Sequence, residues 1–244
     1  MIQEKQIAFV SGATKGIGLA IAIKLQADGY LVIQNSRENI GAKEIQGNDH
    51  LVGDVTKIED CINLINEIKV KYGRLDVLVC NVGSGRAISG ESDVGEYWDH
   101  YKSLNLDSAT FLIETSLNLL MKNRGNVVAI SSICADDPRI NAPVGYASSK
   151  AALQMYMKSM AVKHGKDGLR FNVVSPGNVY FKGSVWEKKL QEDRLGTEKY
   201  INEVVPLRSF ISAEDIAEAV SFLVSEKAKN ITGSILRVDG GQSI

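Results

Sequence analysis

Short runs of apolar, often β-branched residues recur along the chain, and longer stretches of helical periodicity separate them. The runs predict strands, which we place at residues 7–12, 31–35, 50–55, 75–81, 126–132, 169–177 and 234–240. The stretches between them predict helices at about 16–28, 57–71, 96–121, 145–164 and 212–225. Because the strands are continuously apolar rather than alternating, both faces of their sheet are expected to be covered.

This order of elements predicts the fold class. Strands that alternate with helices indicate an α/β protein whose strands run parallel. Right-handed crossovers then give a Rossmann-type doubly wound fold, a seven-stranded, mostly parallel sheet with helices on both faces. The 244 residues contain no internal repeat, low-complexity tract or Pro-rich linker, so we expect residues 1–244 to form a single domain.

Residues 178–210 are the exception to the alternation. They carry Tyr180, Phe181 and Trp186 among many charges, and they follow a strand end, where ligands bind in such folds. We expect a substrate lid with one or two short helices. The alternative is a surface insertion that contacts no substrate.

Composition and charge argue against several classes of partner. The 28 Lys and Arg nearly balance the 29 Asp and Glu, so we expect no nucleic acid and no membrane surface as partner. No apolar run approaches a membrane span, and the first residues lack the pattern of a secretory signal. Cys61, Cys80 and Cys134 are far apart and odd in number, which suggests reduced thiols in a cytoplasmic protein. The three histidines are scattered without ligand spacing, so no metal site is expected.

A glycine-rich turn joins the first predicted strand to the first predicted helix. Gly12, Gly16 and Gly18 permit a tight turn and let main-chain N–H groups approach a pyrophosphate, whose charge the helix N-terminus favours. Such a turn alone is weak evidence for a binding site, but its position between a strand and a helix predicts a dinucleotide site.

Tyr146 and Lys150 lie four residues apart on the predicted helix 145–164, so their side chains share one face. An adjacent ammonium stabilises a phenolate and is expected to bring the phenol closer to acid–base work at neutral pH. Combined with a dinucleotide turn, the pair predicts hydride-transfer chemistry.

The spacing of the three glycines together with the Tyr146–Lys150 pair resembles the short-chain dehydrogenase/reductase family, in particular its 3-oxoacyl-acyl carrier protein reductase-like members. The resemblance extends over essentially the whole chain and includes Asp54, the CNVG segment at 80–83, Asn105, Ser132, Pro176, Gly177 and the terminal VDGG. Jointly these motifs are specific to the family, whereas none is specific by itself.

The resemblance implies a catalytic tetrad of Asn105, Ser132, Tyr146 and Lys150. In this tetrad Tyr146 protonates the developing alkoxide and Ser132 polarises the substrate carbonyl. Lys150 tunes Tyr146 and binds the nicotinamide ribose, and Asn105 holds a water that feeds protons to Lys150. Ser131 is the rival of Ser132, which we favour because the family's serine is usually the second of such a pair.

The end of the second predicted strand indicates which dinucleotide binds. It reads Gln34-Asn35-Ser36-Arg37 and lacks the carboxylate that binds the ribose of NAD. Arg37 can pair instead with a 2′-phosphate. Lys15 matches the second basic position of NADP-dependent relatives. We therefore expect NADP(H); the alternative is a solvated Arg37 and loose selectivity.

The other cofactor contacts follow from the resemblance. Asp54 is expected to contact the adenine, to cap the following helix, or both, and Asn81 is expected to brace the central sheet. The full set of expected cofactor-binding residues is Gly12, Thr14, Lys15, Gly16, Ile17, Gly18, Ser36, Arg37, Asp54, Val55, Asn81, Gly83, Tyr146, Lys150, Pro176 and Gly177.

The substrate is expected to be a small carbonyl or alcohol of the 3-oxoacyl type or similar. A phosphorylated or nucleotide-linked sugar of surface-glycan biosynthesis is the alternative, which Trp186 and the cations near it would suit. Phe181 stands where the family often has a threonine that bonds the nicotinamide, so Ser184 or main-chain groups would take over. A non-catalytic NADP-binding regulator is the competing class, but it would have lost part of the tetrad.

Relatives are commonly tetramers, so a homotetramer is expected. Its interface would use the predicted helices 96–121 and 145–164, whose apolar positions, including Leu112, Leu153 and Met157, are numerous enough to pack on two sides.

Overall fold

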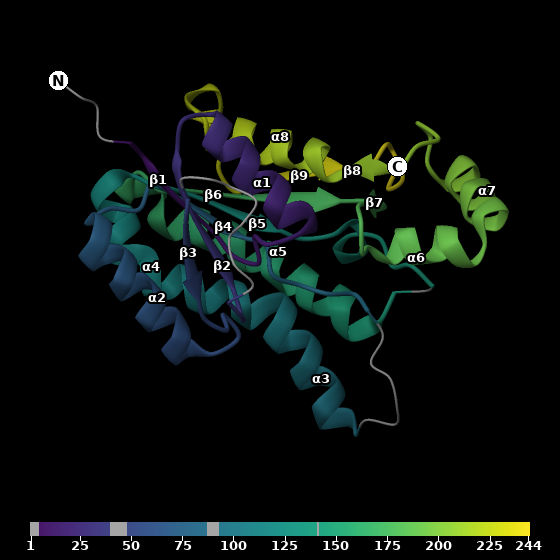
Figure 1. Cartoon of the computed structure of the whole chain (residues 1–244), viewed down its shortest axis with the longest axis horizontal. Helices are drawn as coiled ribbons and strands as arrows, with labels where there is room; N and C mark the ends of the chain where they lie inside the picture. Colours follow the sequence, from purple (N-terminus) through teal and green to yellow (C-terminus); the bar gives the residue numbers. More distant parts are fainter. Residues whose placement is uncertain (1–4, 40–47, 87–92, 141) are drawn as a thin grey trace.

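A seven-stranded parallel sheet forms the centre of the molecule in the computed structural model, which describes residues 5–39, 48–86, 93–140 and 142–244 (Figure 1). The strand order is β3-β2-β1-β4-β5-β6-β9, and each neighbouring pair is parallel. The strands are β1 (Ile7–Val10), β2 (Leu31–Ser36), β3 (Asp49–Val52), β4 (Val77–Cys80), β5 (Asn126–Ile130), β6 (Arg170–Pro176) and β9 (Ile235–Val238). The predicted fold class is therefore confirmed.

The order of the strands reverses between β1 and β4. From β1 the chain steps outward through β2 to β3, then returns to β4 on the other side of β1. In doubly wound sheets, ligands bind outside the carboxyl ends of the strands at such a switch point. The fold therefore predicts a ligand site at the segments that follow β1 and β4.

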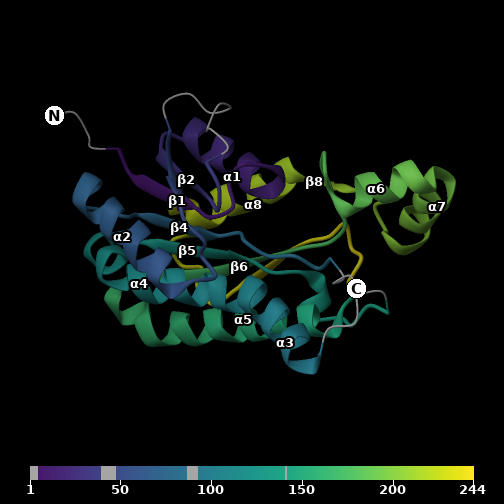
Figure 2. The same cartoon turned by 60° about the horizontal axis from the view of Figure 1, so that its bottom comes forward.

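Helices cover both faces of the sheet, as Figure 2 shows. One face packs against α1 (Gly16–Ala27) and α8 (Ala213–Val224), and the other packs against α2 (Ile58–Tyr72), α4 (Ser108–Asn123) and α5 (Val144–His164). Alternate residues of β1 supply the two cores, since Phe9 belongs to one cluster and Ala8 to the other. This two-sided burial explains why the strands read as continuous apolar runs.

The single helix predicted over 96–121 is divided in the structure. It consists of α3 (Val94–Lys102), a π-helical turn at Ser103–Asp107, and α4. The π-helical turn inserts extra main chain into the helix, and such insertions occur frequently at functional sites. Asn105 lies in the middle of this turn.

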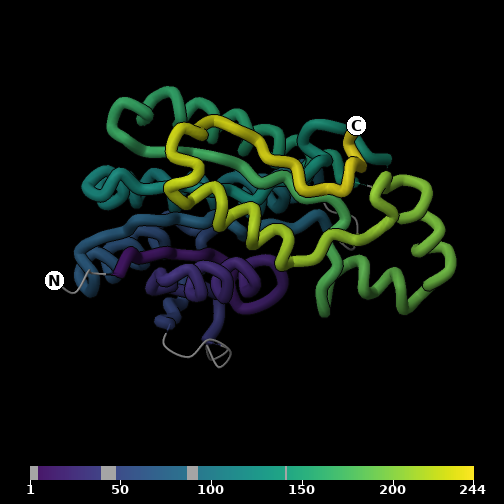
Figure 3. Tube along the Cα trace, turned by 90° about the horizontal axis from the view of Figure 1, so that it is seen from above, coloured from purple at the N-terminus to yellow at the C-terminus, as the bar shows by residue number. Residues whose placement is uncertain are grey.

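The 178–210 segment contains the short helices α6 (Val185–Glu192) and α7 (Arg194–Val204), which lie away from the sheet (Figure 1 and Figure 3). Before and after them, the two-residue strands β7 (Val179–Tyr180) and β8 (Ile211–Ser212) pair in parallel. Trp186 stacks on Tyr200, with ring centroids 5.7 Å apart, and also contacts Phe210. The segment therefore has a small aromatic core of its own.

Candidate active site

The glycine turn has the geometry that the sequence predicts. Gly12 and Gly16 adopt φ values of 63° and 56°, a region that side chains rarely occupy. A Cβ on Gly18 would stand 2.4 Å from the carbonyl oxygen of Gly12, so only glycine fits there. Asn81 donates from Nδ2 to the carbonyl oxygens of Ser11 (3.0 Å) and Gly12 (3.2 Å), and thereby braces the turn.

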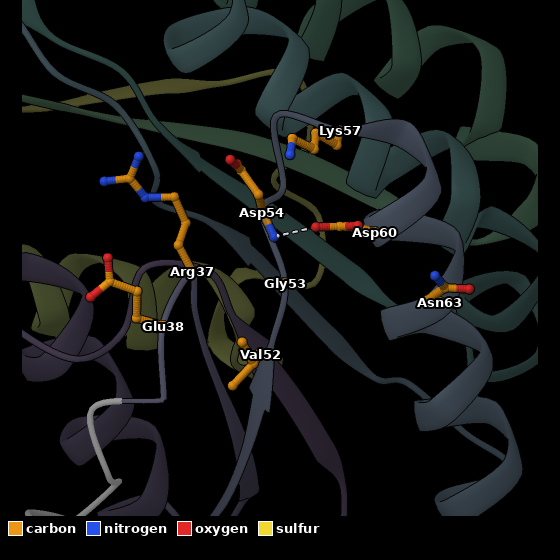
Figure 4. A pocket seen from close by; sticks show the side chains of 8 residues that line it. All are labelled: Arg37, Glu38, Val52, Gly53, Asp54, Lys57, Asp60 and Asn63. Atoms are coloured by element: carbon orange, nitrogen blue, oxygen red, sulfur yellow. Dashed lines mark hydrogen bonds between the residues drawn. The ribbon is translucent and has the colours of Figure 1, made fainter.

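A polar pocket of about 470 Å³ lies beyond the carboxyl ends of β2 and β3 (Figure 4). In the view of Figure 4, Asp54 lies between Arg37 and Lys57. The full lining is Arg37, Glu38, Val52, Gly53, Asp54, Lys57, Asp60 and Asn63. Arg37 and Asp54 were predicted as cofactor contacts, whereas Lys57 and Asp60 were not. Their role in the pocket could have been inferred from their position at the start of the helix after Asp54, because β2 and β3 end at the same edge of the sheet.

Asp54 does not cap the following helix. Its Oδ1 accepts from the N–H (3.0 Å) and the hydroxyl (2.8 Å) of Thr56, in a local turn, while α2 begins only at Ile58. The N–H of Asp54 donates to Oδ2 of Asp60, at 2.8 Å. The prediction of a helix cap was therefore wrong, because the three-residue turn separates the aspartate from the first free N–H groups of α2.

The four residues expected to form the tetrad converge beyond β4 and β5. A Cβ added to Gly83 would stand 2.7 Å from Nζ of Lys150 and 2.8 Å from Oδ1 of Asn105, so both groups meet at this glycine. The Tyr146 ring packs against Gly85, the next glycine along. Ser132 hydrogen-bonds Tyr146 at the end of β5.

Ser131 points away from this cluster. Its hydroxyl donates to the carbonyl oxygen of Lys150, at 3.3 Å, and accepts from Nε2 of Gln154. Consecutive residues of an extended strand point in opposite directions, so only one of the two serines can face Tyr146. In this structure that residue is Ser132.

Burial sets the protonation of the two central groups. It raises the pKa of Tyr146 to about 12, although the hydrogen bond with Ser132 lowers it in part. Burial also lowers the pKa of Lys150 to about 8, and Nζ of this lysine donates to the carbonyl oxygen of Ile130 at 2.7 Å. The sequence predicted that the neighbouring ammonium lowers the pKa of the phenol; in the structure, loss of hydration raises this pKa instead. Tyr146 therefore keeps its proton near neutral pH.

Asn105 is fully buried and fastens the loop after β4. Its Oδ1 accepts from the N–H of Ser84 (2.9 Å), and its Nδ2 donates to the carbonyl oxygens of Ser84 (3.1 Å) and Tyr101 (3.0 Å). The loop carries Gly83 and Gly85, the two glycines that contact Lys150 and Tyr146. Asn105 thus joins this loop to α3 and the π-helical turn.

Comparison with known proteins connects this arrangement to a family. The family profile described as enoyl-(acyl carrier protein) reductase matches residues 12–243. A 3-oxoacyl-[acyl-carrier-protein] reductase of Buchnera aphidicola is 34% identical over 97% of both chains. The chain belongs to the short-chain dehydrogenase/reductase family.

Solved structures of the family superpose over nearly the whole chain. The ligand-free aldohexose dehydrogenase of Thermoplasma acidophilum has a TM-score of 0.85 and 32% identity, covering 98% of this chain and 94% of its own. A short-chain dehydrogenase/reductase oxidoreductase of Burkholderia thailandensis has a TM-score of 0.87 and 28% identity, covering 98% and 93%. An oxidoreductase reaction is thus established for the family to which this chain belongs.

Phe181, which departs from the family's usual threonine, packs against Gly16. Ser184, its expected replacement, caps α6 by accepting from the N–H of Glu187 (3.0 Å), and its Oγ also accepts from the N–H of Phe181 (3.3 Å). Cys134, which the sequence did not single out as a site residue, has a free thiol close enough to Tyr146 to influence its pKa. Cys134 could have been identified from the sequence by its position two residues after Ser132.

Within residues 5–39, 48–86, 93–140 and 142–244, no group of His, Cys, Asp and Glu has the arrangement of a metal site. No helix in these ranges is long and apolar enough to cross a membrane.

Proposed function

We propose that the protein is an NADPH-dependent oxidoreductase that transfers a hydride between the nicotinamide and a carbonyl or alcohol substrate of the 3-oxoacyl type or similar. The observation that carries the proposal is the convergence of Tyr146, Lys150, Ser132 and Asn105 at one edge of the sheet, beside the glycine turn. A regulator that only binds the dinucleotide would not need this complete set. The 34% identity to a 3-oxoacyl reductase supports the substrate class.

The expected cofactor residues would hold a dinucleotide from its adenine to its nicotinamide. Gly12, Gly16 and Gly18, with Thr14 and Ile17, would hold the pyrophosphate, because their turn brings main-chain N–H groups to the N-terminus of α1. Asp54 and Val55 would hold the adenine, with Arg37, Ser36 and Lys15 at the 2′-phosphate. Of these residues, Arg37 and Asp54 line the polar pocket. Asn81, Gly83, Lys150, Pro176 and Gly177 would surround the nicotinamide half. NADPH, when bound, supplies the hydride.

The protein's own groups supply the rest of the reaction. Tyr146, protonated below a pKa of about 12, would donate its proton to the substrate oxygen as negative charge develops there. Ser132 would donate a hydrogen bond to the same oxygen and polarise the carbonyl. Lys150, held at its Nζ by the carbonyl oxygen of Ile130, would face the ribose and place a positive charge near the phenol. Asn105 would keep the loop after β4 closed over these groups.

A sugar is the second candidate substrate. The observation in its favour is the similarity to an aldohexose dehydrogenase, with a TM-score of 0.85 and 32% identity. The 178–210 segment would act as the lid, and Lys189, whose Nζ lies 4.3 Å from the ring centroid of Trp186, would supply a cation for a phosphorylated sugar. A screen of turnover on acyl thioesters and on keto-sugars distinguishes the two candidates.

The cofactor assignment is tested by binding. We expect the wild-type protein to bind NADPH at least about tenfold more tightly than NADH, since Arg37 pairs with the 2′-phosphate. Arg37→Ser should remove most of this preference by weakening NADPH alone, whereas Lys57→Ser tests whether the second cation of the pocket contributes. Titration calorimetry of the wild type and both variants with NADPH and with NADH measures the six affinities. An unchanged preference in Arg37→Ser would show that this residue does not bind the 2′-phosphate.

Three further properties belong to the same proposal. We propose one catalytic domain over residues 1–244, a homotetramer in solution, and a cytoplasmic location. The location is supported by Cys61 and Cys80, which are free and buried. Light scattering tests the assembly, and fractionation of cells that express the tagged protein tests the location.

A further inference from the structure

Phe181 lies across the first residue of α1. A Cβ added to Gly16 would stand 2.5 Å from Cε2 of Phe181 and 2.9 Å from Cδ2, so the ring is in direct contact with the main chain of Gly16. The ring also packs against the apolar cluster to which Ile17 is attached. Gly16 is therefore required for two reasons: its φ of 56° and the ring above it.

The contact lies where an anion would approach α1. Among the described residues no side chain caps the start of this helix, and its first turn holds no acidic residue. Main-chain N–H groups at such a helix start, together with the helix dipole, attract a pyrophosphate. An anion that reaches Gly16 and Ile17 has to enter the space beside the ring of Phe181.

The turn that carries Phe181 also belongs to the start of α6. The N–H of Phe181 donates to Oγ of Ser184, and its carbonyl oxygen accepts from the N–H of Ser184 at 2.9 Å. Gly183, with a φ of 86°, lies between them, and its carbonyl oxygen accepts from Nη2 of Arg86 at 2.9 Å. Movement of the ring would therefore be transmitted to α6 and, through Arg86, to the loop beside Tyr146.

We propose that Phe181 covers the pyrophosphate position at the start of α1, so that dinucleotide binding displaces the ring together with the start of α6. The inference rests on the dinucleotide site proposed above. Ring and pyrophosphate compete for the same face of Gly16, so the affinity for a dinucleotide is lower than the glycine turn alone would give. Phe181 thereby couples arrival of the cofactor to the substrate side of the site.

Titration calorimetry of Phe181→Ala with NADPH and NADH tests the competition. Both affinities are expected to rise by on the order of tenfold, because the apolar contacts of the ring no longer have to be broken. The ratio between the two affinities is expected to stay unchanged, because both dinucleotides share the pyrophosphate. Phe210→Ala is the matched control, since it removes a ring of the same segment that contacts Tyr180 and Trp186. Its affinities are expected to stay within about twofold of the wild type.

Unchanged or weaker binding by Phe181→Ala, in a protein whose wild type binds the dinucleotides, would overturn this inference and leave the proposed function intact. A wild type that binds neither dinucleotide would overturn both. Phe181→Thr serves as a second variant, with the same expected direction, in case the alanine variant does not fold.

Fluorescence tests the displacement directly. The chain has two tryptophans, so in a Trp98→Phe background the signal comes from Trp186 on α6. Addition of NADP⁺, which lacks the near-ultraviolet absorption of the reduced form, is expected to change the emission of Trp186. The change should be smaller in the Phe181→Ala protein. Emission that stays constant at saturating NADP⁺ would contradict displacement of α6.

Discussion

Tyr146 is the residue on which the proposed chemistry depends most directly. Its phenol hydrogen-bonds Ser132, and its pKa of about 12 keeps it protonated at neutral pH. We expect Tyr146→Phe to lower kcat by roughly 10²–10⁴-fold, because the proton donor is lost. Binding of NADPH should change by less than about threefold, since the hydroxyl acts mainly in the transition state. Steady-state kinetics and calorimetry measure the two effects.

Tyr156 provides the control for this experiment. It lies on the same helix, and its hydroxyl donates to Oε1 of Glu114 at 2.9 Å. Tyr156→Phe should retain the activity of the wild type. If Tyr146→Phe also retained activity, the assigned proton donor would be wrong.

Lys150 gives the protein a specific dependence of stability on pH. A lysine with a folded-state pKa of about 8 and an unfolded-state value of 10.5 binds fewer protons in the folded state between these two values. The free energy of unfolding therefore rises with pH in this window, and the stabilisation is lost as the pH falls toward 8. Relative to Lys150→Met, the wild type should gain about 2 kcal/mol between pH 7.5 and pH 10.

Urea unfolding at several pH values measures this difference. Tyr146, whose pKa is raised, opposes the trend only above about pH 10. It is present in both proteins, so its contribution cancels in the comparison. A difference between the two proteins that does not vary with pH would mean that Lys150 is not desolvated. The expected lower stability at neutral pH illustrates how a functional lysine can be retained at a cost in folding free energy.

Single residues could be predicted where a short motif fixes their place. The spacing of Tyr146 and Lys150 places them on one helix face. Ser132 was preferred over Ser131, and in the structure Ser132 is the serine that faces Tyr146. The hydrogen-bond partners of Asn105 could not be predicted, because they are main-chain groups of Ser84 and Tyr101 that only the folded loop brings near. The raised pKa of Tyr146 was also missed, because burial depends on tertiary packing that the sequence does not display.

At the scale of elements, periodicity located the strands and helices within a few residues. The π-helical turn at Ser103–Asp107 was missed because helix continues on both sides of it and no glycine or proline within 96–121 marks the change. The pairing of β7 with β8 was also missed, since two-residue strands carry no periodicity. Both features surround the site: the π-helical turn positions Asn105, and the small sheet joins the two ends of the 178–210 segment to each other.

At the scale of the whole molecule, the helices expected to form an interface need reinterpretation. Leu112, Leu153 and Met157 are buried in the core of the single chain and are not available to a partner. The outer face of α5 carries other apolar residues instead, since Met155 is 62% exposed and Val162 is 87% exposed. They are seven residues apart and so lie on one side of the helix.

We expect this face to form the proposed tetramer. Light scattering should give four times the chain mass of 26.6 kDa for the wild type. The double variant Met155→Glu and Val162→Glu should give a smaller assembly, because charged groups would be buried at the interface. Val70→Glu, at an equally exposed position on α2, is the control and should leave the mass unchanged. A wild type with the mass of one chain would contradict the tetramer.

The parallel sheet has a consequence for how the chain reaches this structure. Ala8 pairs with Val77, and Asn126 pairs with Arg170, so these neighbouring strands join parts of the chain that are far apart in the sequence. Topologies with such non-local pairing fold slowly, because loop-closure entropy is lost before the contacts form. During refolding, unpaired strand edges would stay open to other chains for longer than in a helical bundle. The yield of native protein should therefore fall as the protein concentration rises, because the chains aggregate.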